Sequence, residues 1–160
     1  AWNHSQERKK TSDITDVSEL VLDYEKTLRL IFNDSPKLLL DGQKWHEQIY
    51  DATDACLVKE LEDVRVFNTD GVFCNGAYFS RNNKRSYKSC VVFNANSGAI
   101  TVSFYDGGKA LSAKDIVQHF FGPEAGGHPG CAGSPRGVFY GLTDAMLLAD
   151  VVQSFISNQK

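Results

Sequence analysis

The apolar pattern of this chain changes its period near residue 62, and this change constrains the fold more than any other feature. Before it, apolar residues recur at helical spacing over residues 16–32 and again over residues 36–61. After it, short runs of β-branched and aromatic residues alternate with turn sequences. Helices followed by a series of strands, and then by further helices, predict an α/β (α+β) fold in which helices pack on a mixed central β-sheet.

Two N-terminal helices are expected. The first starts at Asp16 and carries one apolar stripe up to Phe32. The segment Asn33-Asp34-Ser35-Pro36 ends it, because Ser is a good N-cap and Pro suits the first position of a following helix. We expect this second helix to run to about Leu61, with a break at Gly42.

The rest of the chain predicts about five strands and two more helices. The expected strands are Val64–Phe67, Val72–Phe79, Ser89–Ala95, Ile100–Tyr105 and a short one near Val138–Tyr140. Asn96-Ser97-Gly98 indicates a tight hairpin turn. A third helix is expected to start at Ser112 and to end before Gly122. A last amphipathic helix is expected to carry the apolar residues Leu147, Leu148, Val151, Val152 and Phe155.

One domain is therefore expected behind a flexible arm. The polar residues 1–15 form the arm, and residues 16–160 form the domain. Within the domain, residues 16–61 are a helical lead-in and residues 62–160 contain the sheet and a glycine-rich loop.

Charge and cysteine content narrow the classes of partner. The formal net charge is -3, so any phosphate must bind at a local site rather than on a broadly basic surface. The longest apolar run is too short to span a bilayer, and no membrane partner is expected. Four scattered cysteines without a Cys-x-x-Cys pair predict reduced, mostly buried thiols. They indicate an intracellular, reducing compartment (cytoplasm or organelle matrix), with two long-range disulfides as the alternative.

The glycine-rich segment at residues 121–133 carries the chemistry. Five glycines are too many for a simple turn, and they allow successive backbone N–H groups to face one concavity. The small residues Cys131-Ala132-Gly133 suit the start of a short helix, whose N-terminus beside His128 would form a phosphate cradle. The glycines could instead make only a tight connection, with His128 on the surface, and the residues alone favour neither reading.

The run Ala-Gly-Gly-His-Pro-Gly-Cys-Ala-Gly at residues 125–133 resembles the Gly-Gly-Gly-His loop of a known family. That family is the C-terminal domain associated with DHH phosphoesterases, which are related to oligoribonucleases and exopolyphosphatases. In it, the loop follows a helix that ends in Phe-Gly, as Phe121-Gly122 does here, and faces the catalytic cleft. The strand Ile100–Phe104 and the helix through Asp115-Ile116-Val117 match the family's order, and the resemblance spans residues 45–140.

The resemblance implies that the loop, a serine of the preceding strand and a cation hold the substrate phosphate. The implied substrate-binding residues are Gly126, Gly127, His128, Gly130, Ser103 and Arg136. Gly127 is expected to be least tolerant of a side chain, because a Cβ there would block a left-handed backbone or close approach of a ligand.

Two departures from the family's pattern weaken or alter this implied site. Tyr105 stands where the family has an arginine that holds substrate phosphate. Pro123-Glu124 resembles an insertion, and Ala125 replaces the first glycine of the loop. A carboxylate near a phosphate site repels the ligand. Arg136 or Lys109 could supply the missing positive charge.

No catalytic or metal-binding residue is expected in this chain. It contains no Asp-His-His, and none of its four histidines has the spacing of a paired metal site. The resemblance implies manganese in a DHH catalytic half in the same polypeptide or complex. The implied function is binding of nucleotide, short oligonucleotide or polyphosphate for a phosphodiesterase or phosphatase. The alternatives are a non-catalytic structural or interaction subunit with protein partners, and a free-standing nucleotide sensor.

Overall fold

The computed structural model describes residues 25, 26, 28, 29, 33, 36–70, 75–81 and 85–159. The chain divides into two compact units, Ala1–Ile49 and Tyr50–Lys160. The sheet and every predicted site residue belong to the second unit. The expected arm, residues 1–15, lies outside the described residues.

The described N-terminal part contains one complete helix in place of the two expected. This helix, α3 (Pro36–Ala55), starts at the predicted proline and continues through Gly42 without the expected break. It ends at Ala55 rather than near Leu61, because the N–H of Cys56 closes the last turn on the carbonyl of Thr53. The helix expected from Asp16 lies mostly outside the described residues, of which residues 25, 26, 28 and 29 are helical.

A six-stranded mixed sheet forms the centre of the second unit, which confirms the predicted α/β class. The strand order is β1-β2-β5-β6-β8-β7. Their bounds are β1 Leu57–Glu60, β2 Val64–Thr69, β5 Ser89–Asn94, β6 Ala99–Phe104, β7 Gly126–His128 and β8 Cys131–Gly133. The pair β2–β5 is parallel and the other neighbours are antiparallel. A second, two-stranded antiparallel sheet joins β3 (Ser80–Arg81) to β4 (Arg85–Ser86).

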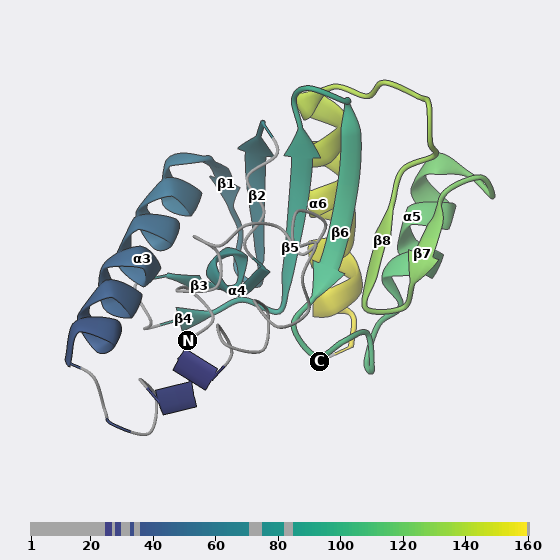
Figure 1. Ribbon diagram of the computed structural model, residues 1–160. Coiled ribbons are helices and arrows are strands. Elements are labelled where there is room, and N and C mark those ends of the chain that lie inside the picture. Colours follow the sequence, from purple (N-terminus) through teal and green to yellow (C-terminus); the bar gives the residue numbers. More distant parts are fainter. Residues whose placement is uncertain are drawn as a thin grey trace. The chain divides into compact units, whose positions relative to one another are not determined.

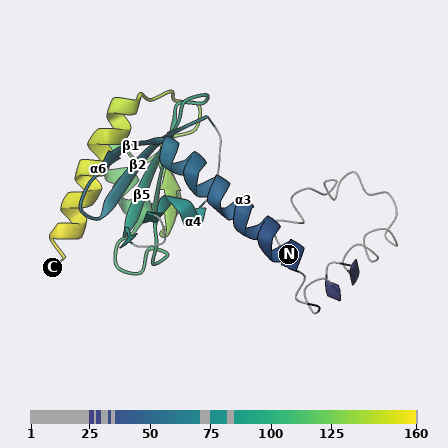
Figure 2. The same cartoon turned by 90° about the vertical axis from the view of Figure 1, so that its left-hand side faces the viewer.

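Helices cover the main sheet unequally. On one face, α6 (Leu142–Ser157) packs on β2 and β5, and α5 (Ala113–Phe121) packs on β6, β8 and β7. Figure 1 shows both helices behind these strands, and no described helix lies in front of β6, β8 and β7. Figure 2 shows α6 on one side of the sheet and the short helix α4 (Asn75–Tyr78) on the other. Among the described residues, no helix therefore covers β6, β8 and β7 on this face.

The side chains follow this division because strand residues alternate between faces. The main core lies under α5 and α6, and it includes Val64, Val66, Val91, Phe93, Ile100, Val102, Phe104 and Ala132. A smaller apolar cluster on the other face contains Phe67, Tyr78, Phe79 and Cys90. The predicted caps of α5 are confirmed: Ser112 accepts a hydrogen bond from the N–H of Asp115, and the helix ends at Gly122.

Two expected strands are wrong. Residues 75–78 of the expected strand Val72–Phe79 form α4, and residues 71–74 lie outside the described residues. The helical turn brings Tyr78 and Phe79 into one apolar cluster, whereas a strand would send neighbouring side chains to opposite faces. Near Val138–Tyr140 the chain forms no strand; it crosses the end of the β5–β6 hairpin, where the N–H of Tyr140 donates to the carbonyl of Gly98.

Candidate functional site

The glycine-rich segment forms a hairpin at the edge of the sheet. Strand β7 runs into a turn at Pro129 and Gly130, and β8 returns from it. The helix start expected at residues 131–133 is wrong, because β8 instead pairs with β6 and buries Ala132 in the main core. This pairing gives hydrogen-bond partners to an edge of β6 that would otherwise lack them. The site therefore contains no helix N-terminus at this point.

The strand register brings predicted and unpredicted residues into one row. Cys90 on β5 lies opposite Ser103 on β6, Ser103 lies opposite Cys131 on β8, and Cys131 lies opposite His128 on β7. Paired residues point to the same face of a sheet. The hydroxyl of Ser103 donates to the Sγ of Cys131 at 3.2 Å. Ser103 and His128 therefore belong to one surface, on the sheet face opposite α5 and α6.

The ring of His128 is held in one orientation at the hairpin turn. The side chain is exposed, and the N–H of Gly130 donates to its Nδ1 at 3.2 Å. An imidazole nitrogen that accepts a hydrogen bond carries no proton, so Nε2 is the nitrogen that bears the proton of the neutral ring. The turn thus leaves Nε2–H as the donor of this histidine.

The three hairpin glycines differ in how much space the structure leaves for a side chain. Gly127 has a φ of 150°, and a Cβ there would lie 2.6 Å from the Cα of Ala132. A Cβ on Gly130 would lie 2.7 Å from the carbonyl oxygen of Gly107. A Cβ on Gly126 would meet no atom within 4 Å. Two of the predicted ligand glycines are therefore required by close approach of the chain to itself.

In a neighbouring loop, backbone N–H groups converge on one point and donate hydrogen bonds to the carboxylate of Asp106. Gly107 and Gly108 have φ of 74° and 81°, and the N–H groups of Gly108 and Ala110 donate to the Asp106 carboxylate at 2.8 and 3.1 Å. Partial burial by itself raises the pKa of Asp106, but these donors and Lys109 outweigh it and lower the pKa below its usual value. This anion site is occupied by the protein's own carboxylate.

The structure does not bring Arg136 to the hairpin turn. The carbonyl of Gly130 accepts from the N–H of Phe104, at one end of β6. The N–H of Ser134, which precedes Arg136, donates to the carbonyl of Ile100 towards the other end. Four residues of strand separate these points, roughly 13 Å. Lys109 is the closer predicted cation, since its neighbour Gly108 packs against Pro129 and Gly130.

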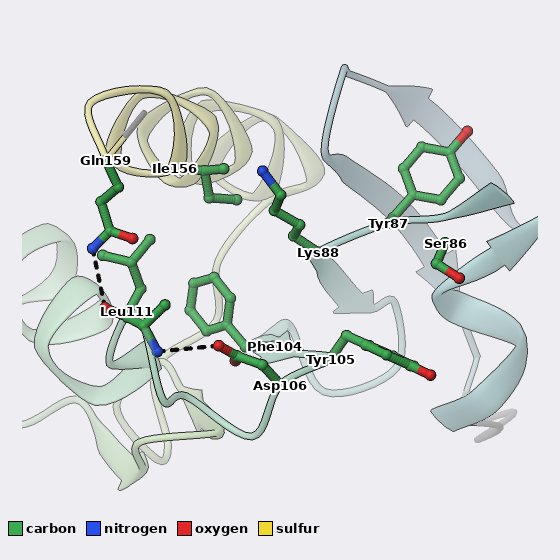
Figure 3. Close-up of a pocket in the computed structure, with 10 residues that line it drawn as sticks. Ser86, Tyr87, Lys88, Phe104, Tyr105, Asp106, Leu111, Ile156 and Gln159 are labelled. Atoms are coloured by element: carbon green, nitrogen blue, oxygen red, sulfur yellow. Dashed lines mark hydrogen bonds between the residues drawn. The ribbon is translucent and has the colours of Figure 1, made fainter.

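A pocket of about 400 Å³ lies at the end of β6, beside this loop. Its lining residues are Ser86, Tyr87, Lys88, Phe104, Tyr105, Asp106, Ala110, Leu111, Ile156 and Gln159. In Figure 3, Phe104 lies between Tyr105 on one side and Leu111 on the other, with Ile156 and Lys88 across from it. No local sequence pattern marks this pocket, because its walls come from four separated segments of the chain.

Sequence reasoning also missed a buried arginine in the same row. Arg65 on β2 lies opposite Cys90, and its side chain is fully buried. Its guanidinium forms an ion pair with Asp54 and donates to the carbonyls of Ala77 and Ser80 at 3.2 and 3.0 Å. A single charged residue in a strand gives no signal of such burial. This arginine joins α3, β2 and α4, so we assign it a structural role.

The cysteines meet the expectation of burial only in part. Cys56, Cys90 and Cys131 are free thiols, and Cys74 lies outside the described residues. Cys90 is buried and Cys56 half-buried, but Cys131 is exposed, so the expected burial is wrong for Cys131. Burial raises the pKa of Cys90 far above its usual value, with a further contribution from the neighbouring Cys131 thiol.

Within the part of the chain that the structure describes, no group of three or more His, Cys, Asp or Glu side chains could hold a metal ion. None of the helices formed by these residues is long and apolar enough to cross a membrane.

Comparison with known proteins identifies no family for this chain. No protein-family model matches the chain, and no curated protein matches it. Among solved structures, the chain is similar to an uncharacterized protein from Helicobacter pylori G27, with 14% sequence identity and a TM-score of 0.37. The match covers 66% of this chain and 29% of the other, so the chain spans less than a third of that protein's length. A likeness this weak supports no statement about function.

Proposed function

We propose that this chain is the substrate-binding part of a DHH-type phosphodiesterase or phosphatase. In this proposal, the phosphate of a nucleotide, a short oligonucleotide or polyphosphate binds at the β7–β8 hairpin. The observation that carries the proposal is the position of His128. Its ring is exposed in one row with Ser103, and its Nε2–H is the donor that the turn leaves for a ligand.

The order of elements around the hairpin supports the same assignment. Strand β6 supplies Ser103, α5 follows with a Phe-Gly end, and the glycine-rich hairpin comes next. This is the order that the resemblance to the DHH-associated domain implies. The hairpin returns beside β6, so that residues 25 positions apart in the sequence, Ser103 and His128, share one surface.

The proposed role is binding without a hydrolytic step. Hydrolysis by two metal ions needs clustered carboxylates and imidazoles. The described residues do not fit such metals, because they contain no group of three potential ligands. In this proposal a DHH catalytic half in the same polypeptide or complex holds the manganese.

Three observations favour a second candidate, a non-catalytic interaction subunit with this fold. Tyr105 replaces the arginine that the family uses for phosphate. Gly127 and Gly130 are explained by backbone packing, without a ligand. In the 107–110 loop, the N–H groups of Gly108 and Ala110 already donate to the Asp106 carboxylate. Each of these removes a reason to infer phosphate binding and is compatible with the same fold.

Calorimetric titration with a mononucleotide and a dinucleotide distinguishes the two candidates. A charge-assisted hydrogen bond contributes about 1.5–3 kcal/mol, so His128→Ala should weaken binding about tenfold or more. His119→Ala is the matched control, because His119 is also exposed but lies on α5, where its ring contacts Phe155. This control should bind like the wild type.

Two results would remove the substrate-binding assignment. One is a wild-type chain that binds neither ligand. The other is binding that His128→Ala and His119→Ala change to the same small extent. Either result leaves the interaction subunit as the better account of the chain.

A further inference from the structure

We infer that Cys131 is a modification site, and that a group attached to its sulfur closes the proposed phosphate site. The modifying reagent is a small disulfide such as glutathione disulfide, which leaves one glutathione bound to the cysteine. The inference rests on the proposed phosphate site at Ser103 and His128, and it adds a means of regulating that site.

Cys131 lies between the two side chains that are proposed to hold phosphate. Strand β8 runs between β6 and β7, as Figure 1 shows, and its register places Cys131 opposite Ser103 on one side and His128 on the other. The hydroxyl of Ser103 donates to the Cys131 Sγ at 3.2 Å. Opposite Cα atoms of an antiparallel pair are about 4.5–5.5 Å apart. The three side chains therefore form one cluster, and a group on the sulfur occupies the space between the other two.

The fold leaves the sulfur of Cys131 accessible to a reagent in solution. Cys131 and His128 are both exposed, whereas Ala132, the next residue of β8, is buried in the main core on the other face. Among the other described cysteines, Cys90 is buried and Cys56 is half-buried. Thiol–disulfide exchange depends on access to the attacking sulfur. Of the described thiols, Cys131 should therefore react first.

The neighbouring buried thiol cannot remove the attached group. Cys90 on β5 and Cys131 on β8 lie on either side of Ser103. Two strand spacings separate them, so their Cα atoms are roughly 10 Å apart. A disulfide needs Cα atoms within about 7 Å of each other. Cys90 therefore cannot form a disulfide with Cys131 in the folded sheet, and an external thiol such as dithiothreitol reverses the modification.

Thiol–disulfide exchange supplies the chemistry. The thiol of Cys131 gives up its proton, and its sulfur attacks one sulfur of glutathione disulfide. A new S–S bond forms as the S–S bond of the reagent breaks, and the second glutathione leaves as a thiolate that takes up the proton. Cys131 is oxidised and the reagent is reduced. The attached glutathione has a net negative charge, so it opposes phosphate binding by repulsion as well as by its volume.

The test is calorimetric titration of the full chain with adenosine 5′-monophosphate, before and after treatment with glutathione disulfide. Peptide mapping by mass spectrometry locates the added group, which should be on Cys131. The affinity of the treated wild type should fall about tenfold or more, the loss expected for one charge-assisted hydrogen bond, and dithiothreitol should restore it. Cys131→Ser is the matched control, because it retains the other three cysteines. Its affinity should be the same before and after treatment.

The outcomes separate this inference from the proposed function. The inference is overturned if the wild type with glutathione on Cys131 binds the nucleotide as tightly as the reduced protein. It is also overturned if the treatment modifies Cys56 and leaves Cys131 free, or if treated Cys131→Ser loses affinity as the wild type does. In each of these cases the reduced protein still binds, and the phosphate site stands. If the reduced wild type does not bind the nucleotide, the proposed function fails and the regulation fails with it.

Discussion

Replacing Gly127 by alanine should destabilise the β7–β8 hairpin, whereas the same change at the adjacent Gly126 should not. The added Cβ of Gly127→Ala would lie 2.6 Å from both the Cα of Ala132 and the carbonyl oxygen of Cys131. These are backbone atoms of the paired strand β8, which cannot move aside without breaking its pairing with β6. Gly126 faces open space.

The magnitude follows from two terms. A non-glycine residue in a sparsely populated backbone region costs about 1–3 kcal/mol. Overpacking against fixed neighbours costs about 1–3 kcal/mol more. The two terms overlap, because a small backbone shift relieves both, so we expect Gly127→Ala to lower the free energy of unfolding by about 2–4 kcal/mol. Gly126→Ala should change it by less than about 0.5 kcal/mol.

Thermal unfolding followed by circular dichroism measures the difference. For a chain of this size, 1 kcal/mol corresponds to about 2–4 °C in Tm, so Gly127→Ala should unfold at least about 5 °C below Gly126→Ala. Equal Tm values would refute the packing explanation of Gly127 and restore close approach of a ligand as the reason for this glycine. The expected result also means that lost ligand binding in a Gly127 variant says nothing about the site.

Two further predictions concern the buried row on the sheet. Arg65→Met should lower the free energy of unfolding in urea by about 3 kcal/mol, because it leaves Asp54 and two carbonyls without their hydrogen-bond donor. Lys59→Met breaks the exposed pair with Asp150 and should lower it by less than about 1 kcal/mol. Similar losses in the two variants would contradict the structural role of Arg65. Because burial raises the pKa of Cys90, the folded thiol stays protonated while the unfolded thiol ionises above its ordinary pKa of 9.0, so stability should fall as the pH rises from 8 to 10. The wild type should lose about 1 kcal/mol more over this interval than Cys90→Ala, and an identical pH dependence of the two proteins would show that Cys90 is not buried as described.

The elements that the sequence predicts correctly are those with local signals. The β5–β6 hairpin has a turn at Asn96-Ser97-Gly98, and α5 has Ser112 and Gly122 at its ends. In both cases the residues that determine the structure are neighbours in the chain. The missed elements depend on distant partners. Strand β1 forms because β2 offers it an edge, and α4 forms because two aromatic rings fill one cluster.

In the candidate site, too, the features with a local signal are predicted and those that depend on distant contacts are not. The composition of residues 121–133 marks a special segment, and the resemblance adds Ser103 to it. That Ser103 and His128 share a row depends on strand register, which no local pattern in residues 131–133 reveals. For the same reason, Arg136 is close to the hairpin in the sequence but lies towards the other end of β6. The pocket and the buried Arg65 also require contacts between distant segments.

Nuclear magnetic resonance of the backbone amides tests the central claim most directly. Titration of the ¹⁵N-labelled chain with adenosine 5′-monophosphate should shift the amides of residues 126–130 and of Ser103. The amides of residues 134–137, near the other end of β6, serve as an internal control and should not move. Shifts confined to that loop, or an unchanged spectrum at millimolar nucleotide, would contradict a phosphate site at the β7–β8 hairpin.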